Sequence, residues 1–347
     1  MPQVTMVVDM QFGSTAKGKL VQELVQTGEY SAVMRVQSVQ AGHTVIDKGK
    51  TFKMRTIPCG WVNPNVSLVI GPGQFIDIPL LLAEVEMLEQ HGVNVRDRLF
   101  IDYRASVIDD GDVRAEETAD LTGKIGSTSE GAGASLVRKI MRSDAHIQVG
   151  KREDERLDDF MLADTVKMFS HPDYHVLIEG SQGTMLSLHT SPYYPYVTSR
   201  ECTAAGVLSE TGFSPMDVVA IWGTARTFPI RVGGNSGDTA GREVSWKEVA
   251  ERSGNMALVP ERTTVTNRQR RIFEWSRSDF DDALLLNKPT HLFLTFIDYI
   301  NHEDYGKTRW GDLSDVTRGR IIHLEQMHGV RFNLLSTGEQ PEHTIYR

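Results

Sequence analysis

The chain contains little cysteine: Cys59 and Cys202 are the only two among its 347 residues. Two cysteines cannot form a disulfide framework, and neither belongs to a C-x2-C spacing typical of metal sites. The N-terminus lacks the basic-then-apolar pattern of a signal peptide, and no apolar run approaches the ~20 residues that span a bilayer. We therefore expect a protein of the reducing cytoplasm that has no membrane partner.

Positive charge is also scarce, because 37 Lys and Arg residues face 46 Asp and Glu residues, giving a net charge of -9. A nucleic-acid-binding surface needs a basic footprint, so we expect no nucleic-acid partner. The basic residues gather locally instead, as in Arg262, Arg268, Arg270 and Arg271. Such a local concentration suits a small anionic ligand.

Apolar runs and amphipathic stretches alternate along the chain, which favours an α/β fold with a mostly parallel central sheet flanked by helices. No linker or repeat divides the sequence, so we expect one large domain spanning residues 1–347. The predicted strands are Val4–Met10, Ala32–Val36, Ser67–Ile70, Leu99–Tyr103, His175–Glu179, Asp217–Trp222 and His291–Phe296. The predicted helices are Leu20–Val25, Ile78–Gln90, Ser245–Arg252, Ser278–Leu286 and Asp315–Gln326, and a hairpin is predicted over Thr44–Arg55. Gly, Ser and Thr between Asp110 and Ser143 predict loops that order around a ligand.

The segment Gly13-Ser14-Thr15-Ala16-Lys17-Gly18-Lys19 follows the first predicted strand and leads into a helix. A strand, a Gly-rich turn and a helix N-terminus direct backbone N–H groups at phosphate. The segment fits G-x4-G-K of a P-loop, but Leu20 stands where Ser or Thr would hold Mg²⁺. We expect a phosphate-binding loop that is not an ordinary P-loop.

Three further segments end predicted strands or contain spaced polar residues. In Ala41-Gly42-His43-Thr44, the histidine is either a solvated loop residue or a general acid, and the residues alone leave both open. In Glu179-Gly180-Ser181-Gln182-Gly183-Thr184, small neighbours expose an amide that can pair with a base. The hydroxyls and arginines between Thr263 and Arg271 suit a carboxylate or phosphate.

Taken in chain order, these segments resemble adenylosuccinate synthetases. The sequences typical of that family are W-G-D-E-G-K-G-K, N-A-G-H-T, G-T-T-G-R-G-I-G-P, E-G-A-Q-G-T, Y-P-Y-V-T-S, R-V-G, T-T-G-R-x-R-R, L-T-K-x-D and S-T-G-P. The matching segments here are Phe12–Lys19, Gln40–Thr44, Gly126–Gly133, Glu179–Thr184, Tyr194–Ser199, Arg231–Gly233, Arg268–Arg271, Leu294–Asp298 and Ser336–Glu339. The resemblance implies a ligase that phosphorylates O6 of a purine nucleotide and then joins the amine of L-aspartate to C6.

The resemblance also implies the roles of individual residues. His43, Lys17 and the residue at position 14 are the catalytic residues, with His43 as proton donor. The purine nucleotide is bound by Ser14, Gln40, Ser127, Thr128, Arg142, Gln182, Thr198 and Val232. The triphosphate is bound by Gly13, Ser14, Thr15, Ala16, Lys17, Gly18, Gly42, His43, Thr44, Arg270, Asp298, Ser336, Gly338 and Glu339. Val265, Thr266 and Arg268 take aspartate, Ser14 and Gly42 hold Mg²⁺, and Arg142 acts from the partner of a homodimer.

Ser14 is a departure from this family, which has a catalytic Asp at that position that removes the N1 proton. A hydroxyl is a weak base, and loss of a general base costs about 10²–10⁴ in rate. Ser14 is smaller than Asp and can accept a hydrogen bond from the 2-amino group of guanine. This pattern, and a chain that is short for the family, resemble a phage branch that acts on dGMP in making 2-aminoadenine. Such a protein works in the host cytoplasm if the chain is viral.

Phe296 is a second departure, because it replaces the Lys of the guanine-reading L-T-K-x-D. Loss of that Lys removes the contact to guanine O6, so we expect ATP or dATP in place of GTP. Two alternatives stay open: an ordinary adenylosuccinate synthetase using IMP and GTP, and an inactive nucleotide-binding homologue.

Overall fold

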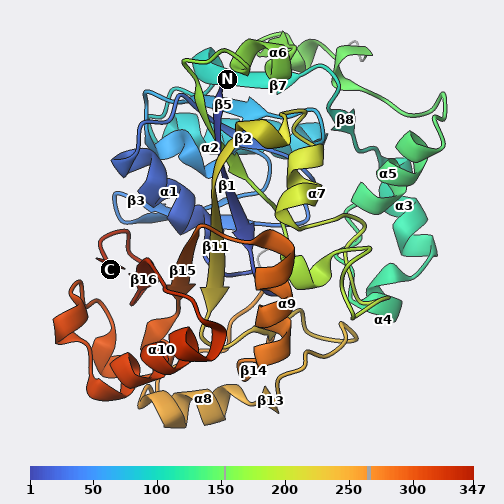
Figure 1. The fold of residues 1–347 in the computed structure, drawn as a ribbon. Coiled ribbons are helices and arrows are strands. Elements are labelled where there is room, and N and C mark those ends of the chain that lie inside the picture. Colours follow the sequence, from blue (N-terminus) through green and yellow to red (C-terminus); the bar gives the residue numbers. More distant parts are fainter. Residues whose placement is uncertain (152–153, 264–266) are drawn as a thin grey trace.

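A long, mostly parallel sheet organises the protein (Figure 1). The computed structural model describes residues 1–151, 154–263 and 267–347, and within these ranges ten strands form this sheet. In spatial order they are β17 (Thr344–Tyr346), β16 (Leu334–Ser336), β15 (His291–Thr295), β11 (Val218–Arg226), β1 (Gln3–Asp9), β10 (His175–Glu179), β2 (Ala32–Arg35), β5 (Ser67–Ile70), β7 (Leu99–Asp102) and β9 (Met161–Ala163). Only the β16–β17 pair of this sheet is antiparallel.

The strand β1 lies at the centre because both of its faces are apolar. Val4, Met6 and Val8 point to one hydrophobic core, whereas Val7 points to the other, as the alternation of side chains along a strand requires. Buried strands of this kind are typical of parallel sheets covered on both faces. Parallel strands end at the same edge, where α/β proteins bind ligands.

Helices cover both faces of the sheet (Figure 1). They are α1 (Lys17–Thr27), α2 (Ile78–Gln90), α3 (Asp110–Thr118), α4 (Leu121–Ile125), α5 (Ala132–Ile140), α6 (Thr165–Phe169), α7 (Ala204–Ser209), α8 (Trp246–Ser253), α9 (Arg277–Asn287) and α10 (Asp315–His328). Small sheets pair β3 (His43–Asp47) with β4 (Lys50–Met54), β6 (Phe75–Ile76) with β8 (Ser106–Val107), and β14 (Arg271–Phe273) with β12 (Ile230–Arg231) and β13 (Glu243–Val244).

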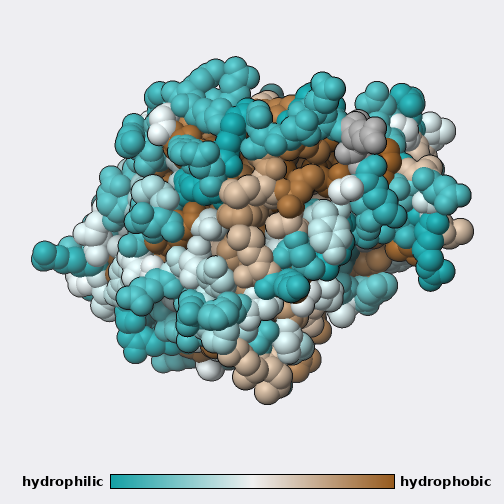
Figure 2. All heavy atoms as spheres, turned by 90° about the horizontal axis from the view of Figure 1, so that it is seen from above, coloured by the Kyte–Doolittle hydropathy of each residue, from teal (hydrophilic) through white to brown (hydrophobic). Residues whose placement is uncertain are grey.

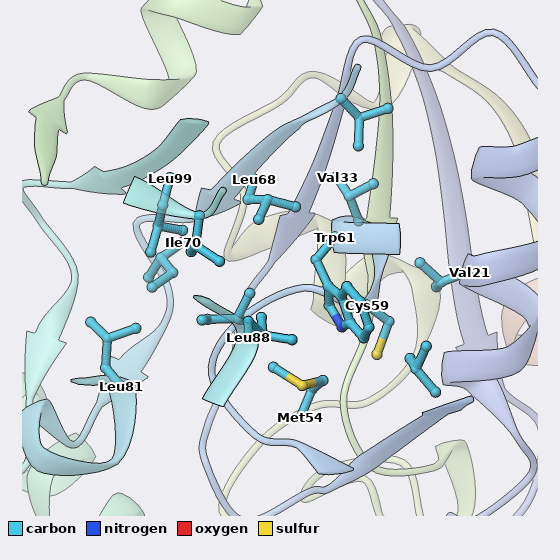
Figure 3. Close-up of a cluster of buried hydrophobic side chains, with 14 of the residues drawn as sticks. Val21, Val33, Met54, Cys59, Trp61, Leu68, Ile70, Leu81, Leu88 and Leu99 are labelled. Atoms are coloured by element: carbon cyan, nitrogen blue, oxygen red, sulfur yellow. The ribbon is translucent and has the colours of Figure 1, made fainter. Parts of the chain in front are cut away.

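One core packs α1 and α2 against the sheet. Figure 3 shows the buried Trp61 and Cys59 between Val21 of α1 and Leu88 of α2. The second core, on the other face, contains residues of α7, α9 and α10. The two cores fix the strands from both sides, so the loops after the strands start from fixed positions.

The surface in Figure 2 is polar around a group of apolar side chains in its middle. None of the helices formed by the described residues has the length and apolar character needed to cross a membrane.

The predicted α/β fold with a mostly parallel sheet is confirmed, and all seven predicted strands occur with ends shifted by a few residues. The prediction of loops over Asp110–Ser143 is wrong. That segment forms α3, α4 and α5, and α3 begins with a capping box between Asp109 and Asp112. Local capping and the packing of α5 on α3 outweigh the low helix propensity of Gly, Ser and Thr.

Candidate active site

A cavity of about 520 Å³ lies where β1, β10, β11 and β15 end. It is continuous from the loop before α1 to the turn after β16. The predicted site residues that line it are Gly13, Ser14, Thr15, Ala16, Lys17, Gly18, Gln40, Gly42, His43, Thr44, Thr128, Gln182, Val232, Arg270, Asp298, Ser336, Gly338 and Glu339. Residues from eight separate segments of the chain therefore meet in one cavity.

The loop between β1 and α1 is held in an unusual backbone conformation. Ser14 and Ala16 have φ values of 57° and 60°, in the left-handed region that few non-glycine residues adopt. The buried carboxylate of Asp9 fixes the loop, since it accepts hydrogen bonds from Thr15 Oγ1 at 2.6 Å and Gln11 N at 2.7 Å. A Cβ on Gly18 would lie 2.4 Å from Thr44 O, so only glycine allows α1 to begin here.

The ammonium group of Lys17 lines the cavity, and neighbouring oxygen atoms already neutralise part of its charge. Its Nζ lies 3.2 Å from Asp9 Oδ2 and donates to Gln182 O at 2.5 Å. The ammonium group is almost fully buried, and burial of an unpaired charge costs free energy. These contacts offset that cost. They also direct Lys17 from the start of α1 towards Gln182, which follows β10.

Two arginines contact Ser14. Arg270 donates a short hydrogen bond to Ser14 Oγ, and Arg226 Nη1 donates to Ser14 O at 3.2 Å. Glu261 orients both: it accepts hydrogen bonds from both Nη atoms of Arg226, and Arg270 Nε lies 3.9 Å from its Oε2. Burial opposes ionisation of Glu261, but the charge and hydrogen bonds of Arg226 outweigh it and lower the pKa of the carboxyl.

The sequence interpretation did not include Arg226, Glu261 and Asp9. Asp9 and Arg226 are the last residues of β1 and β11. Because ligands bind at the carboxyl ends of parallel strands, a search for charged residues near the ends of these strands would have found them. Glu261 lies in an irregular segment, and no pattern in the sequence identifies it.

His43 lies on the cavity wall with one ring nitrogen paired and the other without a partner among the described residues. Its Nδ1 forms a short hydrogen bond with Glu179 Oε1, while the buried Nε2 has no partner in the described part of the chain. Burial and the charge of Arg35 lower the pKa of His43 to about 4. Burial alone would raise the pKa of Glu179, but His43 and Arg35 lower it to about 2. The pair at neutral pH is therefore a neutral imidazole and a carboxylate.

His43, Glu179 and Cys59 form a cluster whose possible metal-ligand atoms lie within 4.8 Å of one another. The cluster does not fit a metal ion, because both Glu179 oxygens are occupied, Oε1 by His43 and Oε2 by Cys59 N at 2.7 Å. Burial also raises the pKa of the Cys59 thiol, whereas a metal needs the thiolate.

The far end of the cavity combines two acids with a buried lysine. Lys19 Nζ donates to Ser336 Oγ at 2.8 Å and to Gly338 O at 2.9 Å, and burial lowers its pKa to about 8. Burial and the neighbouring charge of Glu339 raise the pKa of Asp298 to about 7. Phe296 lies beneath the guanidinium of Arg226, 3.8 Å from its Cζ to the ring centre.

Other predicted residues lie apart from the cavity wall. Ser127, Arg142, Thr198 and Arg268 do not line it in the part of the chain that the structure describes. Thr198 is close, since its N–H bonds to the carbonyl of the lining residue Leu186 at 2.8 Å. Arg142 is exposed just after α5. Val265 and Thr266 lie outside the described residues.

Comparisons with known proteins identify the family. The model of the adenylosuccinate synthetase family matches residues 6–161 and 151–308. The adenylosuccinate synthetase of Methanocaldococcus jannaschii is 34% identical over 349 residues, which cover 98% of this chain and 96% of that protein. The N6-succino-2-amino-2'-deoxyadenylate synthase of Vibrio phage phiVC8 is 33% identical over 313 residues, covering 87% and 88%. The structure of the succinoaminodeoxyadenylate synthetase of cyanophage S-2L, bound to dGMP and dATP as an energy donor, has a TM-score of 0.83 and 25% identity and covers 100% and 95%.

These comparisons correct one interpretation. The short chain does not favour the phage branch, because the archaeal synthetase matches it over nearly the full length of both proteins. Identity to the archaeal and phage relatives is almost equal, so overall similarity does not choose between their substrates. The family model, the relatives and the fold agree on the coarser statement: the chain belongs to the adenylosuccinate synthetase family, whose members are nucleotide-binding ligases of purine biosynthesis.

Proposed function

We propose that the protein joins L-aspartate to C6 of dGMP, driven by ATP or dATP, and so forms N6-succino-2-amino-2'-deoxyadenylate. The observation that carries the proposal is Ser14, whose hydroxyl stands in the cavity where the family has a catalytic Asp. Related phage proteins are named for this product, and one of them was solved with dGMP and dATP.

Ser14 suits a purine that carries a 2-amino group. Its Oγ accepts one hydrogen bond from Arg270 and keeps a second lone pair for the exocyclic amine. An Asp side chain here would be larger, and its carboxylate would form an ion pair with Arg270. The small hydroxyl leaves room beside N1, where guanine and hypoxanthine differ.

The reaction has two steps. The γ-phosphoryl group moves from the triphosphate to O6, and the amine of aspartate then attacks C6 and releases phosphate. The purine must first lose the N1 proton so that negative charge reaches O6. The guanidinium of Arg270 beside Ser14 favours that anion. Because Ser14 is too weak a base, the N1 proton passes to water or to a phosphate oxygen of a substrate. Lys17, with the backbone N–H groups of the loop, holds the phosphate oxygens.

His43 acts on the phosphoryl group through its unpaired Nε2. In the protein without ligands its pKa of about 4 makes it neutral at pH 7. Phosphate anions next to Nε2 raise that pKa, since an opposite charge favours the imidazolium form. Glu179 keeps Nδ1 protonated and aims the ring, so the proton carried by Nε2 is given to the transferring group.

Mg²⁺ fits this site only with phosphate present. The protein offers the neutral carbonyl oxygen of Gly42. The hydroxyl of Ser14, predicted as the second ligand, is not available, because it accepts from Arg270 and uses its other lone pair for the exocyclic amine. Phosphate oxygens would supply the remaining ligands. When bound, Mg²⁺ polarises the phosphoryl oxygens.

Phe296 supports ATP or dATP over GTP. Phe296 follows β15, and its aromatic ring packs against the guanidinium of Arg226. The family has a lysine at this position, which contacts guanine O6. The ring can stack on either purine, so the guanine-specific contact is lost without a loss of apolar contact.

A homodimer completes the nucleotide site in this proposal, with Arg142 reaching the phosphate of dGMP in the partner. Val137, Ile140 and Met141 near the end of α5 are 59%, 63% and 73% exposed. Apolar side chains next to an exposed arginine are typical of a subunit interface. Arg268, with Val265 and Thr266, takes the carboxylates of aspartate.

The test is an assay of dGMP and IMP side by side, each with L-aspartate and with ATP or GTP. We expect phosphate release and the succino product, identified by its mass, with dGMP and ATP. Turnover of IMP with GTP alone would make the protein an ordinary adenylosuccinate synthetase. Tight binding of dGMP and ATP without phosphate release would make it an inactive homologue.

A further inference from the structure

Asp298 faces the cavity without a paired cation in the described residues. It lies on the 3-10 turn Ile297–Tyr299 after β15, next to Glu339. Two cations whose charges act on Asp298 bind other groups: Lys19 binds Ser336, Gly338 and the carbonyl of His343, and Arg226 binds both oxygens of Glu261.

The groups around Asp298 favour its neutral form on balance. The titratable neighbours are Lys19 from α1, Arg226 from β11, Glu261, Tyr299, Tyr305 and Glu339. Glu339 and Glu261 repel a negative charge at Asp298, and Arg226 attracts it. The largest cause is burial in the cavity wall, which removes water from the carboxylate, and the pKa of Asp298 rises to about 7.

Phe296 is the reason that a counter-ion is missing. A lysine at this position, two residues before the acid, would place an ammonium group beside it and keep it ionised. The phenylalanine stacks with Arg226 instead, at 3.8 Å. The same substitution therefore removes a contact to guanine and changes the charge of the acid that remains.

A neutral carboxyl group matches adenine. Adenine presents the exocyclic N6 amine as a donor next to an acceptor ring nitrogen, and a carboxylic acid presents an acceptor next to a donor. Guanine presents two neighbouring donors, N1–H and the 2-amino group, which match an ionised carboxylate instead. The protonation state of one acid thus discriminates between the two triphosphates.

We propose that Asp298 binds the adenine of ATP or dATP as a neutral carboxylic acid, donating its O–H to a ring nitrogen and accepting from N6. This inference rests on the proposed function, because it takes from it the position of the triphosphate in the cavity. It does not depend on which purine nucleotide is aminated. Above neutral pH the ionised acid takes one proton from solvent when adenine binds, and nothing is oxidised or reduced.

The test measures binding of a non-hydrolysable ATP analogue by calorimetry in two buffers with different heats of ionisation. For the natural protein we expect Asp298 to account for uptake of up to about one proton per site near pH 8 and for little near pH 6, in addition to any proton that His43 takes up beside the phosphates. The affinity should fall by up to about tenfold per pH unit above pH 7, as linkage to one proton requires. Asp298→Asn is the matched variant, because its amide keeps a donor and an acceptor at every pH. It should bind the analogue near pH 6 as the natural protein does and lack the part of the uptake that belongs to Asp298, whereas uptake by His43 is common to both proteins.

Phe296→Lys provides a second, independent variant. Its ammonium group should ionise Asp298 and shift the ratio of GTP-analogue to ATP-analogue affinity towards GTP by about tenfold or more. Equal proton uptake by the natural protein and Asp298→Asn, or loss of ATP-analogue binding by Asp298→Asn at every pH, overturns the inference.

The binding assay contains no dGMP, so its outcome separates the two proposals. If the proton uptake is found but dGMP is not aminated, the inference stands and the acceptor in the proposed function is wrong. If the GTP analogue binds better at every pH, this inference fails together with the ATP part of the proposed function.

Discussion

At the scale of single residues, the proposed function assigns the choice between purines to the side chain at position 14. Its φ of 57° is a conformation that Asp adopts more readily than most residues, so Ser14→Asp should not strain the loop. We expect the ratio of kcat/KM for dGMP to that for IMP to fall by about 10–100-fold, because crowding of the 2-amino group costs about 1–3 kcal/mol. Initial rates with each nucleotide under saturating aspartate and triphosphate measure this ratio.

Ser14→Ala is the control for size. Alanine leaves the same space but cannot accept a hydrogen bond from the amine, and Ala16 shows that the loop tolerates alanine at φ 60°. The Ala variant should lose part of its preference for dGMP, because hypoxanthine has no 2-amino group that bonds to the hydroxyl, and the loss should be smaller than in Ser14→Asp. If Ser14→Asp used dGMP as well as the natural protein does, the role given to the hydroxyl would be wrong.

At the scale of elements, Lys19 joins α1 to the turn after β16. Its three oxygen partners lie within 3.1 Å, and two of them belong to Ser336 and Gly338, which are predicted to bind the triphosphate. Lys19→Met should raise KM for ATP by about tenfold or more, because hydrogen bonds to a charged donor contribute about 1.5–3 kcal/mol. KM for dGMP should change little, since Lys19 points to the opposite end of the cavity.

Lys19→Gln is the conservative partner of this variant, because its amide can still donate two hydrogen bonds. It should recover part of the ATP affinity. The melting temperatures of both variants, compared with that of the natural protein, control for a loss of stability. A parallel rise of KM for both nucleotides would assign Lys19 a general role in stability instead.

Much of this architecture could be predicted from local signals. Asp77 caps α2, accepting from Leu80 N at 3.0 Å, and the helix spans the residues that the pattern predicted. The loop before α1 could be predicted as a candidate phosphate site because glycines and lysines follow a strand, and it lines the cavity. Arg226 and Glu261 were missed because their roles depend on contacts between segments 35 residues apart. The charge of Asp298 depends on burial and on Glu339, which sequence spacing does not reveal.

At the scale of the whole molecule, the position of Arg142 predicts how two chains share a site. α5 packs on α3 at the outer edge of the molecule, and Arg142 follows it on the surface, away from the cavity wall of its own chain (Figure 1). If Arg142 serves the partner, then Arg142→Ala and His43→Ala remove different parts of each shared site. Both variants alone should be nearly inactive with dGMP.

Mixing the two variants then tests the sharing directly. After random exchange of subunits, half of the dimers are hybrids, and each hybrid has one site that contains both natural residues. The mixture should therefore recover about a quarter of the natural activity, as two-fold symmetry requires. Sedimentation of the natural protein establishes the dimer independently. If the two variants exchange subunits and activity does not return, Arg142 acts within its own chain or not at all. A residue that serves the site of its own chain cannot be supplied by the partner.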